Sequence, residues 1–189
     1  TAVARRPKPG APARVVCMGS LNLQKGADLI LELARLNQMN GQRFEFHFLG
    51  NRPPDFAPEK YGGIYHGSYA RDGLQVMLER IAPSYSLLAP VCEETFSFTL
   101  SESWASGLPV FASDRGALSE RISTHGGGWL FDPEDAGRFF SGMVKVLDCP
   151  REWDRQSDLV QKIPLAGLEQ ECRSLKAYFD RVLAEGDSS

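Results

Sequence analysis

The sequence is poor in cysteine and histidine, and these residues are not spaced as metal ligands. The cysteines are Cys17, Cys92, Cys149 and Cys172, and only three histidines accompany them. No two cysteines form a C-x-x-C pair, which argues against a zinc site. Because Cys17 and Cys92 lie in apolar, strand-like runs, we expect both to be buried free thiols in a reducing compartment.

An excess of positive charge is also lacking. The chain has 21 Lys plus Arg against 24 Asp plus Glu, a formal net charge of -3. It therefore has no basic field that would attract nucleic acid, and an anionic ligand must be held by local geometry. No apolar run reaches the roughly 18 residues of a membrane helix, and the opening residues do not show the pattern expected of a signal peptide. We expect a cytoplasmic protein with no nucleic-acid partner.

The opening stretch TAVARRPKPGAPA has no apolar core and no initiator methionine, so residues 1–13 are predicted to be a linker within a longer protein. A length of 189 residues with 42% hydrophobic content suits one well-buried domain. We assign that domain to residues 14–150. Residues 151–189 are expected to form two helices that pack on the domain or cross from it.

Apolar runs alternate with helical patterns along the domain. RVVCMG, RFEFHFLG, GGIYHG, SYSLLAP, LPVFAS and GGGWLF are typical of strands, and stretches such as KGADLILELARLNQM repeat apolar residues at helical spacing. This order predicts an α/β fold, a Rossmann-like doubly wound parallel sheet. Ligands of such sheets bind beyond the carboxyl ends of the strands, so the loops after Gly19, Gly50, Gly67, Pro90 and Ser113 are candidates.

The loop GSLNLQKG follows the first predicted strand. Gly19 ends the strand, and Lys25 and Gly26 lie near the start of a helix. Free amides at a helix N-terminus with one lysine outline a phosphate site. The spacing matches neither G-x-G-x-x-G nor a P-loop, which disfavours a nicotinamide dehydrogenase and an ATPase. A turn glycine with a solvated lysine is the alternative, and this loop alone favours it.

The stretch EETFSFTLSE carries two carboxylates, Glu94 and Glu102. One helix would separate them by about 12 Å and one strand by roughly 26 Å, and neither suits a shared small site. We expect instead a loop through residues 95–97 and a helix that starts near Phe98 or Thr99. Thr99 and Glu102 also match a capping box, which is the structural alternative for Glu102.

A loop followed by a helix would leave the amides of Ser97, Phe98 and Thr99 at the positive end of the helix dipole. A diphosphate could bind these amides, with Glu94 on one side and Glu102 on the other. Because carboxylates repel phosphate, both would accept hydrogen bonds from neutral hydroxyls instead. A diphosphate flanked by hydroxyl-rich groups describes a nucleotide sugar.

EETFSFTLSESWASGLPVFAS resembles the E-x-F-x-x-x-x-x-E-x-x-x-x-G-x-P-V motif of retaining GT-B glycosyltransferases of family 4, the group 1 type. MGSLNLQKGADLILELA is similar to the G-R-x-x-x-x-K-G stretch of their C-terminal domain, and DRGALSERI and GGGWLFDPED resemble the segments that follow. The resemblance spans about residues 14–147 in order. It implies the C-terminal, donor-binding half of a GT-B fold.

The resemblance implies a role for each motif position. Glu94 would be catalytic and contact the donor sugar near the reacting carbon, Glu102 would bind the ribose hydroxyls, and Lys25 would contact the diphosphate. The amides of residues 96–99 would hold donor phosphate or sugar hydroxyls, and no metal or other cofactor would be needed. The implied donor-binding residues are Gly19, Ser20, Lys25, Thr95, Phe96, Ser97, Phe98, Thr99 and Glu102.

Ser20 departs from the family pattern, which usually has arginine at this position. A bidentate cation on the diphosphate is lost, and removing a preorganised charge can cost on the order of 10²–10³ in rate. Either Arg52 or Arg115, on nearby predicted loops, replaces that charge, or activity is weak or absent.

The resemblance implies transfer of a hexose from a UDP- or GDP-linked sugar to a glycan or lipid-linked acceptor, in bacterial surface polysaccharide synthesis such as that of O-antigen. The acceptor would bind a missing N-terminal GT-B domain, so this chain alone would be inactive. The parent protein would be cytoplasmic or held at the inner face of the membrane. The alternatives are a degenerate domain that binds a nucleotide sugar, a nucleotide-sugar epimerase, and a non-enzymatic module that binds no nucleotide.

Overall fold

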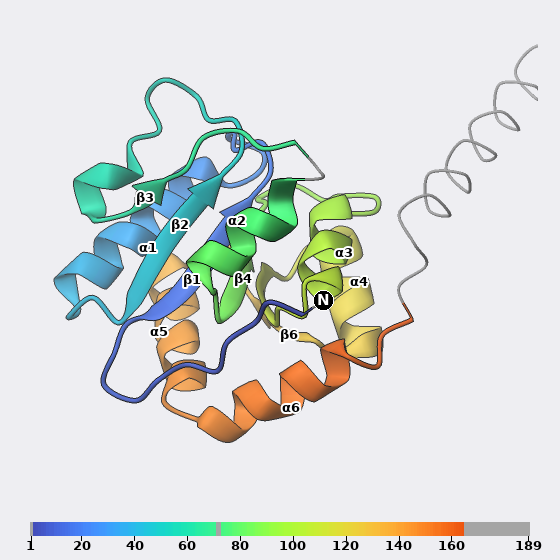
Figure 1. Ribbon diagram of the computed structural model, residues 1–189. Coiled ribbons are helices and arrows are strands. Elements are labelled where there is room, and N and C mark those ends of the chain that lie inside the picture. The colour runs from blue at the N-terminus through green and yellow to red at the C-terminus, as the bar shows by residue number, and fades with distance from the viewer. Residues whose placement is uncertain (1, 71–72, 165–189) are drawn as a thin grey trace, which may run out of the picture.

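The computed structural model, described for residues 2–70 and 73–164, contains one six-stranded parallel sheet with helices on both faces (Figure 1). The strand order is β3-β2-β1-β4-β5-β6. This is the order of a Rossmann-like doubly wound sheet, as predicted, and it reverses between β1 and β4. The strands are β1 (Ala13–Met18), β2 (Phe44–Leu49), β3 (Ile64–Tyr65), β4 (Tyr85–Leu88), β5 (Val110–Ser113) and β6 (Gly128–Phe131).

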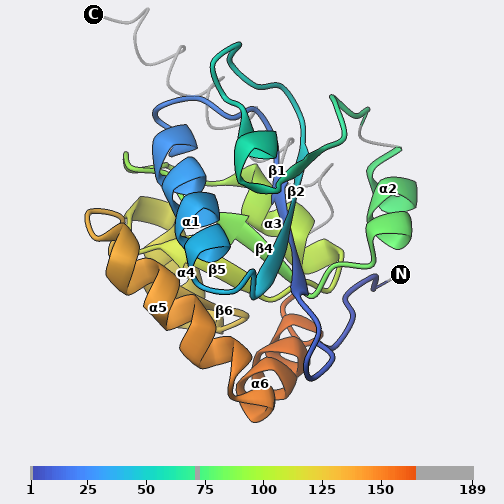
Figure 2. The same ribbon diagram turned by 90° about the vertical axis from the view of Figure 1, so that its left-hand side faces the viewer.

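Helix α1 falls within KGADLILELARLNQM, the stretch whose apolar spacing predicts a helix. Helices α1 and α5 pack together on one face of the sheet, and α2 covers the other (Figure 2). The helical segments are α1 (Ala27–Met39), the 3-10 turn η1 (Pro58–Tyr61), α2 (Leu74–Ile81), α3 (Phe98–Ala105), α4 (Gly116–His125), α5 (Ala136–Leu147) and α6 (Pro150–Val160).

The alternating aromatics of β2 build the larger core. Phe44, Phe46 and Phe48 are buried on the face covered by α1 and α5, because alternate side chains of a strand point to the same side. Val16 and Leu49 belong to a second cluster beneath α2. Strands β4 and β5 are buried along their whole length, as expected of central strands of a parallel sheet.

The segment before β1, expected as a linker, is extended and packs on the domain. The amide of Val3 donates to the Ser106 carbonyl at 2.9 Å, and Val3 is buried. Farther along, Arg6 pairs with Asp154 of α6 at 2.7 Å. The segment thus connects the end of α3 with α6.

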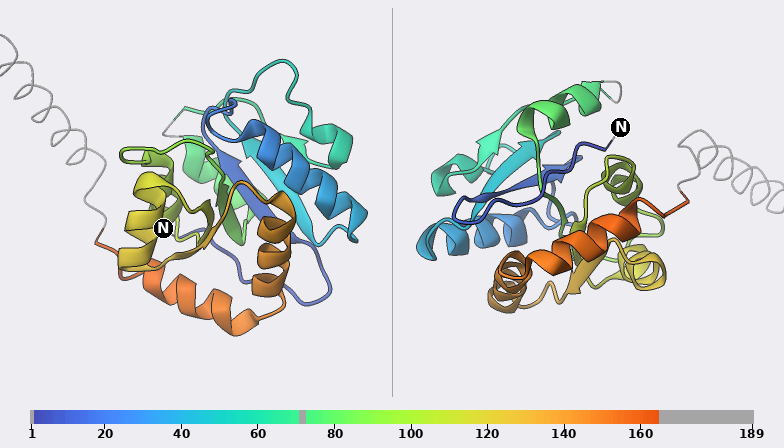
Figure 3. Two further views of the ribbon diagram at one scale, coloured as in Figure 1. Left: turned by 180° about the vertical axis from the view of Figure 1, so that it is seen from behind. Right: turned by 60° about the horizontal axis from the view of Figure 1, so that its bottom comes forward.

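Helix α6 is the first of the two helices expected in the tail, and it crosses the bottom of the domain (Figure 3). Trp153 Nε1 donates to the Ser84 carbonyl at 3.0 Å, just before β4 begins. The second expected helix, residues 169–183, lies outside the described residues. In the part of the chain that the structure describes, no helix is long and apolar enough to cross a membrane.

The prediction for the two strand cysteines is half right. Cys17 lies in the middle of the sheet, where burial raises the pKa of its thiol. Cys92 is exposed, because β4 ends at Leu88 and the chain has already entered the loop before α3. The apolar run before Cys92 extends beyond the strand it predicts.

Candidate functional site

A hollow of about 40 Å³ lies at the carboxyl ends of β1 and β4, where the strand order reverses. Sheets of this type bind their ligands at such a switch point. The hollow has room for a small polar group and is far smaller than a nucleotide sugar, so most of such a ligand would lie outside it. The predicted site residues that line it are Gly19, Ser20, Lys25, Glu94, Ser97 and Thr99.

Gly26 brings the β1–α1 loop against the end of β4. Its φ is +75°, and a Cβ there would lie 1.7 Å from the Ala89 carbonyl oxygen, so only glycine allows this approach. The loop is held further by a hydrogen bond of 2.8 Å from the Lys25 amide to the Asn22 side chain. The lysine predicted to contact phosphate is therefore fixed at the switch point by its backbone.

Lys25 forms an ion pair with Glu94 across the hollow. Lys25 Nζ donates to Glu94 Oε1, and the Glu94 side chain is only 15% exposed against 46% for Lys25. The backbone of Glu94 is held as well, because the Ala117 amide of α4 donates to the Glu94 main-chain carbonyl at 2.9 Å. The structure thus joins two residues that were predicted to contact different parts of a ligand.

Helix α3 starts at Phe98, as predicted, with its N-terminus at the hollow. Its N-cap is Ser97, in the left-handed conformation (φ 62°, ψ 82°), and no side chain caps the helix. Thr99 is therefore already inside the helix, so the capping box of Thr99 and Glu102 does not form. The amides of Phe98 and Thr99 precede the first hydrogen bond of this turn, which the Leu100 amide donates to the Ser97 carbonyl. Amides at this position of a helix can bind an anion.

The other predicted residues lie around the hollow rather than on its wall. Thr95 and Phe98 are exposed, Phe96 and Glu102 are partly buried, and none of the four lines the hollow. The rings of Phe96 and Phe98 pack against each other, with centroids 5.0 Å apart.

The two arginines considered as replacements at Ser20 are engaged elsewhere. Arg52 pairs with Glu59 at 2.7 Å and lies over the ring of Tyr65. Arg115 donates to Glu134 at 3.1 Å. Among the described residues that line the hollow, Lys25 is the one lysine or arginine.

Sequence reasoning missed Arg121 of α4, which touches the loop before α3. Its guanidinium donates to the carbonyl oxygens of Phe96 and Ser97, 3.0 and 3.2 Å away. No local pattern marks Arg121, because its partners lie 24 and 25 positions earlier in the chain.

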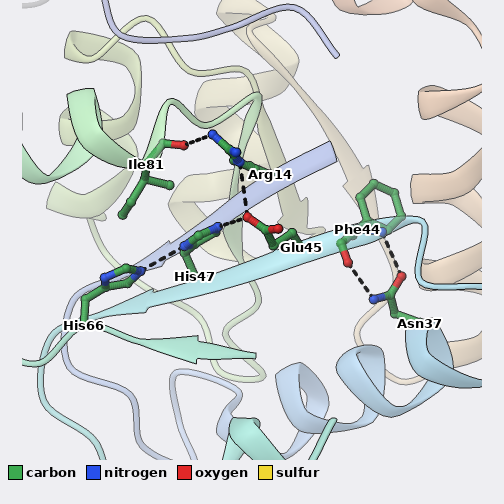
Figure 4. Close-up of polar contacts among 7 residues, drawn as sticks. All are labelled: Arg14, Asn37, Phe44, Glu45, His47, His66 and Ile81. Atoms are coloured by element: carbon green, nitrogen blue, oxygen red, sulfur yellow. Dashed lines mark hydrogen bonds and ion pairs between the residues drawn. The ribbon is translucent and has the colours of Figure 1, made fainter. Parts of the chain in front are cut away.

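A second polar cluster lies on the face of the sheet beside α2 (Figure 4). Since the Glu45 carboxylate can only accept, His47 Nε2 donates to it at 2.7 Å, and His47 Nδ1 meets His66 Nε2 at 2.9 Å. Burial lowers the pKa of both histidines. Within residues 2–70 and 73–164, no group of three or more His, Cys, Asp or Glu side chains is placed to hold a metal ion.

The chain matches a known protein family. The family described as "Glycosyl transferases group 1" matches residues 12–149. The comparison with curated proteins found no match.

Solved structures share the fold at low identity. The lipopolysaccharide outer core galactosyltransferase WaaB is 20% identical, with a TM-score of 0.67 over 95% of this chain and 52% of its own. HepE from Anabaena, solved with UDP and glucose, is 15% identical, with a TM-score of 0.65 over 94% of this chain and 48% of its own. The C-terminal domain of LpcC, a group 1 family protein from Francisella tularensis, is 18% identical, with a TM-score of 0.61 over 80% of this chain and 86% of its own.

The chain spans about half the length of WaaB and HepE. The parallel sheet with interleaved helices is that of the C-terminal domain of GT-B glycosyltransferases.

Proposed function

The chain belongs to the group 1 glycosyl transferases, and from this premise we propose that it is the donor-binding domain of a retaining, family 4 glycosyltransferase. One observation carries the proposal: Lys25, Glu94 and the N-terminus of α3 meet in a single hollow at the switch point of the sheet. These groups come from two loops, the one between β1 and α1 and the one between β4 and α3, which are far apart in the sequence.

The hollow offers charges that suit a sugar diphosphate. The amides at the start of α3 would receive the diphosphate, and Lys25 would neutralise part of the charge that develops on the leaving nucleotide. As Lys25 turns to the phosphate, Glu94 would lose its cation and accept hydrogen bonds from the sugar hydroxyls near the reacting carbon. Glu102, farther along α3, would hold the ribose. The leaving phosphate would help to deprotonate the acceptor, and no metal would be required.

The solved relatives suggest the substrate class. HepE was solved with UDP and glucose, and WaaB is a lipopolysaccharide galactosyltransferase. We therefore propose a UDP- or GDP-linked hexose as donor and a glycan or lipid-linked acceptor of a bacterial surface polysaccharide. The acceptor would bind an N-terminal GT-B domain of the parent protein, in the cytoplasm or at the inner face of the membrane.

A second candidate is a domain that binds the donor but has lost catalysis. Ser20 lines the hollow where the family usually has arginine, and both Arg52 and Arg115 are committed to other partners. In this case Ser20→Arg should tighten diphosphate binding, because it restores a bidentate cation.

Calorimetric titration of the chain with UDP, GDP, dTDP and ADP tests the proposal. We expect one nucleotide to bind selectively, equally well with and without EDTA, and to bind more weakly to Lys25→Met. Arg138→Met is the matched control, since Arg138 is 89% exposed on α5 and does not line the hollow. The absence of binding by all four nucleotides, to both the wild type and Ser20→Arg, would contradict the proposed function.

A further inference from the structure

Ser97 occupies a backbone conformation that serine rarely adopts. Its φ of 62° lies in the left-handed region, and the residue is only 8% exposed. A non-glycine residue keeps such a conformation only where its surroundings hold it there. Because Ser97 is the N-cap of α3 and lines the hollow, this conformation also sets the direction of the first amides of the helix.

Arg121 makes the contacts that can hold it. Its Nη1 donates to the carbonyl oxygens of Phe96 and Ser97, at 3.0 and 3.2 Å, and its Nη2 donates to Ser101 Oγ at 2.9 Å. One planar guanidinium thus joins the loop to the first turn of α3. Since the Ser97 carbonyl also accepts from the Leu100 amide at 3.2 Å, both ends of this turn are fixed.

Aromatic rings hold the guanidinium in turn. Its central carbon lies 4.7 Å from the centroid of the Phe96 ring and 5.2 Å from that of Trp104. Trp104 is 2% exposed, and its Nε1 donates to the Gly127 carbonyl at 3.0 Å, so this ring is anchored in the core. Lysine lacks both the planar fork and the stacking surface that these contacts use.

We propose that Arg121 is a positioning residue for the donor site, which it serves by holding Ser97 in the left-handed conformation. Arg121 does not line the hollow, so it would act through the backbone of residues 96–98 rather than on the ligand. The inference rests on the proposed function, because the amides that Arg121 would orient are the ones that the diphosphate would bind at the N-terminus of α3.

A double-mutant cycle tests the proposal. Arg121→Met should weaken nucleotide binding by about tenfold, a size typical of coupling between residues in contact. Ser97→Gly removes the conformational strain, because glycine adopts positive φ freely. In the Ser97→Gly background, Arg121→Met should therefore weaken binding by less than about threefold. Arg138→Met is again the surface control, and Arg121→Lys should behave like Arg121→Met.

Each result of this cycle supports or overturns the positioning role of Arg121. Unchanged affinity in Arg121→Met, or an equal loss in both backgrounds, would overturn the role of Arg121, since packing alone does not depend on the φ of residue 97. If Arg121→Met fails to fold, Arg121→Lys, which keeps the charge and the long stem, takes its place in the same cycle. If neither the wild type nor Ser20→Arg binds a nucleotide, the proposed function fails, and hydrogen exchange tests Arg121 separately. The amides of residues 97–100 should then exchange faster in the variant, and unchanged exchange would overturn the inference.

Discussion

Gly116, the first residue of α4, lies directly against the backbone of the proposed catalytic residue. A Cβ at this position would be 2.7 Å from the Glu94 carbonyl oxygen and 2.9 Å from the Glu94 amide nitrogen. The atoms that this Cβ would meet belong to the backbone, which cannot move aside as a flexible side chain can. Gly116→Ala must therefore push α4 and the Glu94 loop apart. The hydrogen bond of 2.9 Å from the Ala117 amide to the Glu94 carbonyl would break or lengthen.

Gly62→Ala is the matched control for this substitution. Gly62 also has positive φ, but a Cβ there would meet nothing within 4 Å. Both substitutions place alanine in the left-handed region, at roughly 1–2 kcal/mol. Only Gly116→Ala adds overpacking and a lost hydrogen bond, which brings its expected loss of unfolding free energy to roughly 3–6 kcal/mol.

Urea unfolding of the two variants measures this difference, and nucleotide titration of Gly116→Ala measures its effect on the site. We expect Gly116→Ala to bind nucleotide more weakly wherever it remains folded, because Glu94 is displaced, and Gly62→Ala to bind as the wild type does. Equal losses of stability in the two variants, with unchanged affinity in both, would refute the claim that α4 positions Glu94.

Three further predictions concern side chains. Lys25→Met should reduce the unfolding free energy by less than about 1 kcal/mol, since its ion pair with Glu94 is partly solvated. Calorimetry should nevertheless show that Lys25→Met binds nucleotide roughly tenfold more weakly or worse. Asn37→Ala should cost about 2–4 kcal/mol in urea unfolding, because the buried Asn37 side chain bonds both the amide and the carbonyl of one β2 residue, at 2.9 and 2.8 Å (Figure 4). Burial lowers the pKa of His47 and His66 from 6.5, so the folded state binds fewer protons than the unfolded state and the unfolding free energy should fall as the pH drops below about 6.5. Urea unfolding at several pH values should show a smaller fall in the double variant His47→Gln, His66→Gln.

Local patterns in the sequence were sufficient to predict the sheet and to name the two loops that border the hollow among five candidates. The alternation of Phe44, Phe46 and Phe48 predicts β2 because every second side chain of a strand shares a face. The end of β1 next to Gly19 and the start of α3 at Phe98 were likewise predicted from short-range preferences. Both loops then meet at the switch point because the strand order places β1 beside β4.

Contacts between distant residues could not be predicted in this way. The capping-box pattern pointed to Thr99, but the helix starts after Ser97, whose conformation is held from α4, 24 positions away. Lys25 and Glu94 are 69 positions apart, and their pairing depends on how closely Gly26 approaches Ala89. Nothing in the local sequence shows which loop the guanidinium of Arg121 reaches.

Amide chemical-shift mapping with the tightest-binding nucleotide tests the central claim most directly. If the nucleotide diphosphate binds at the switch point, the largest shifts will fall on Gly19, Ser20 and residues 97–99. A larger cavity of about 440 Å³ lies at the opposite end of the sheet, between residues 7–12 and the loop at residues 41–43. Largest shifts around that cavity, with none at the start of α3, would contradict the account.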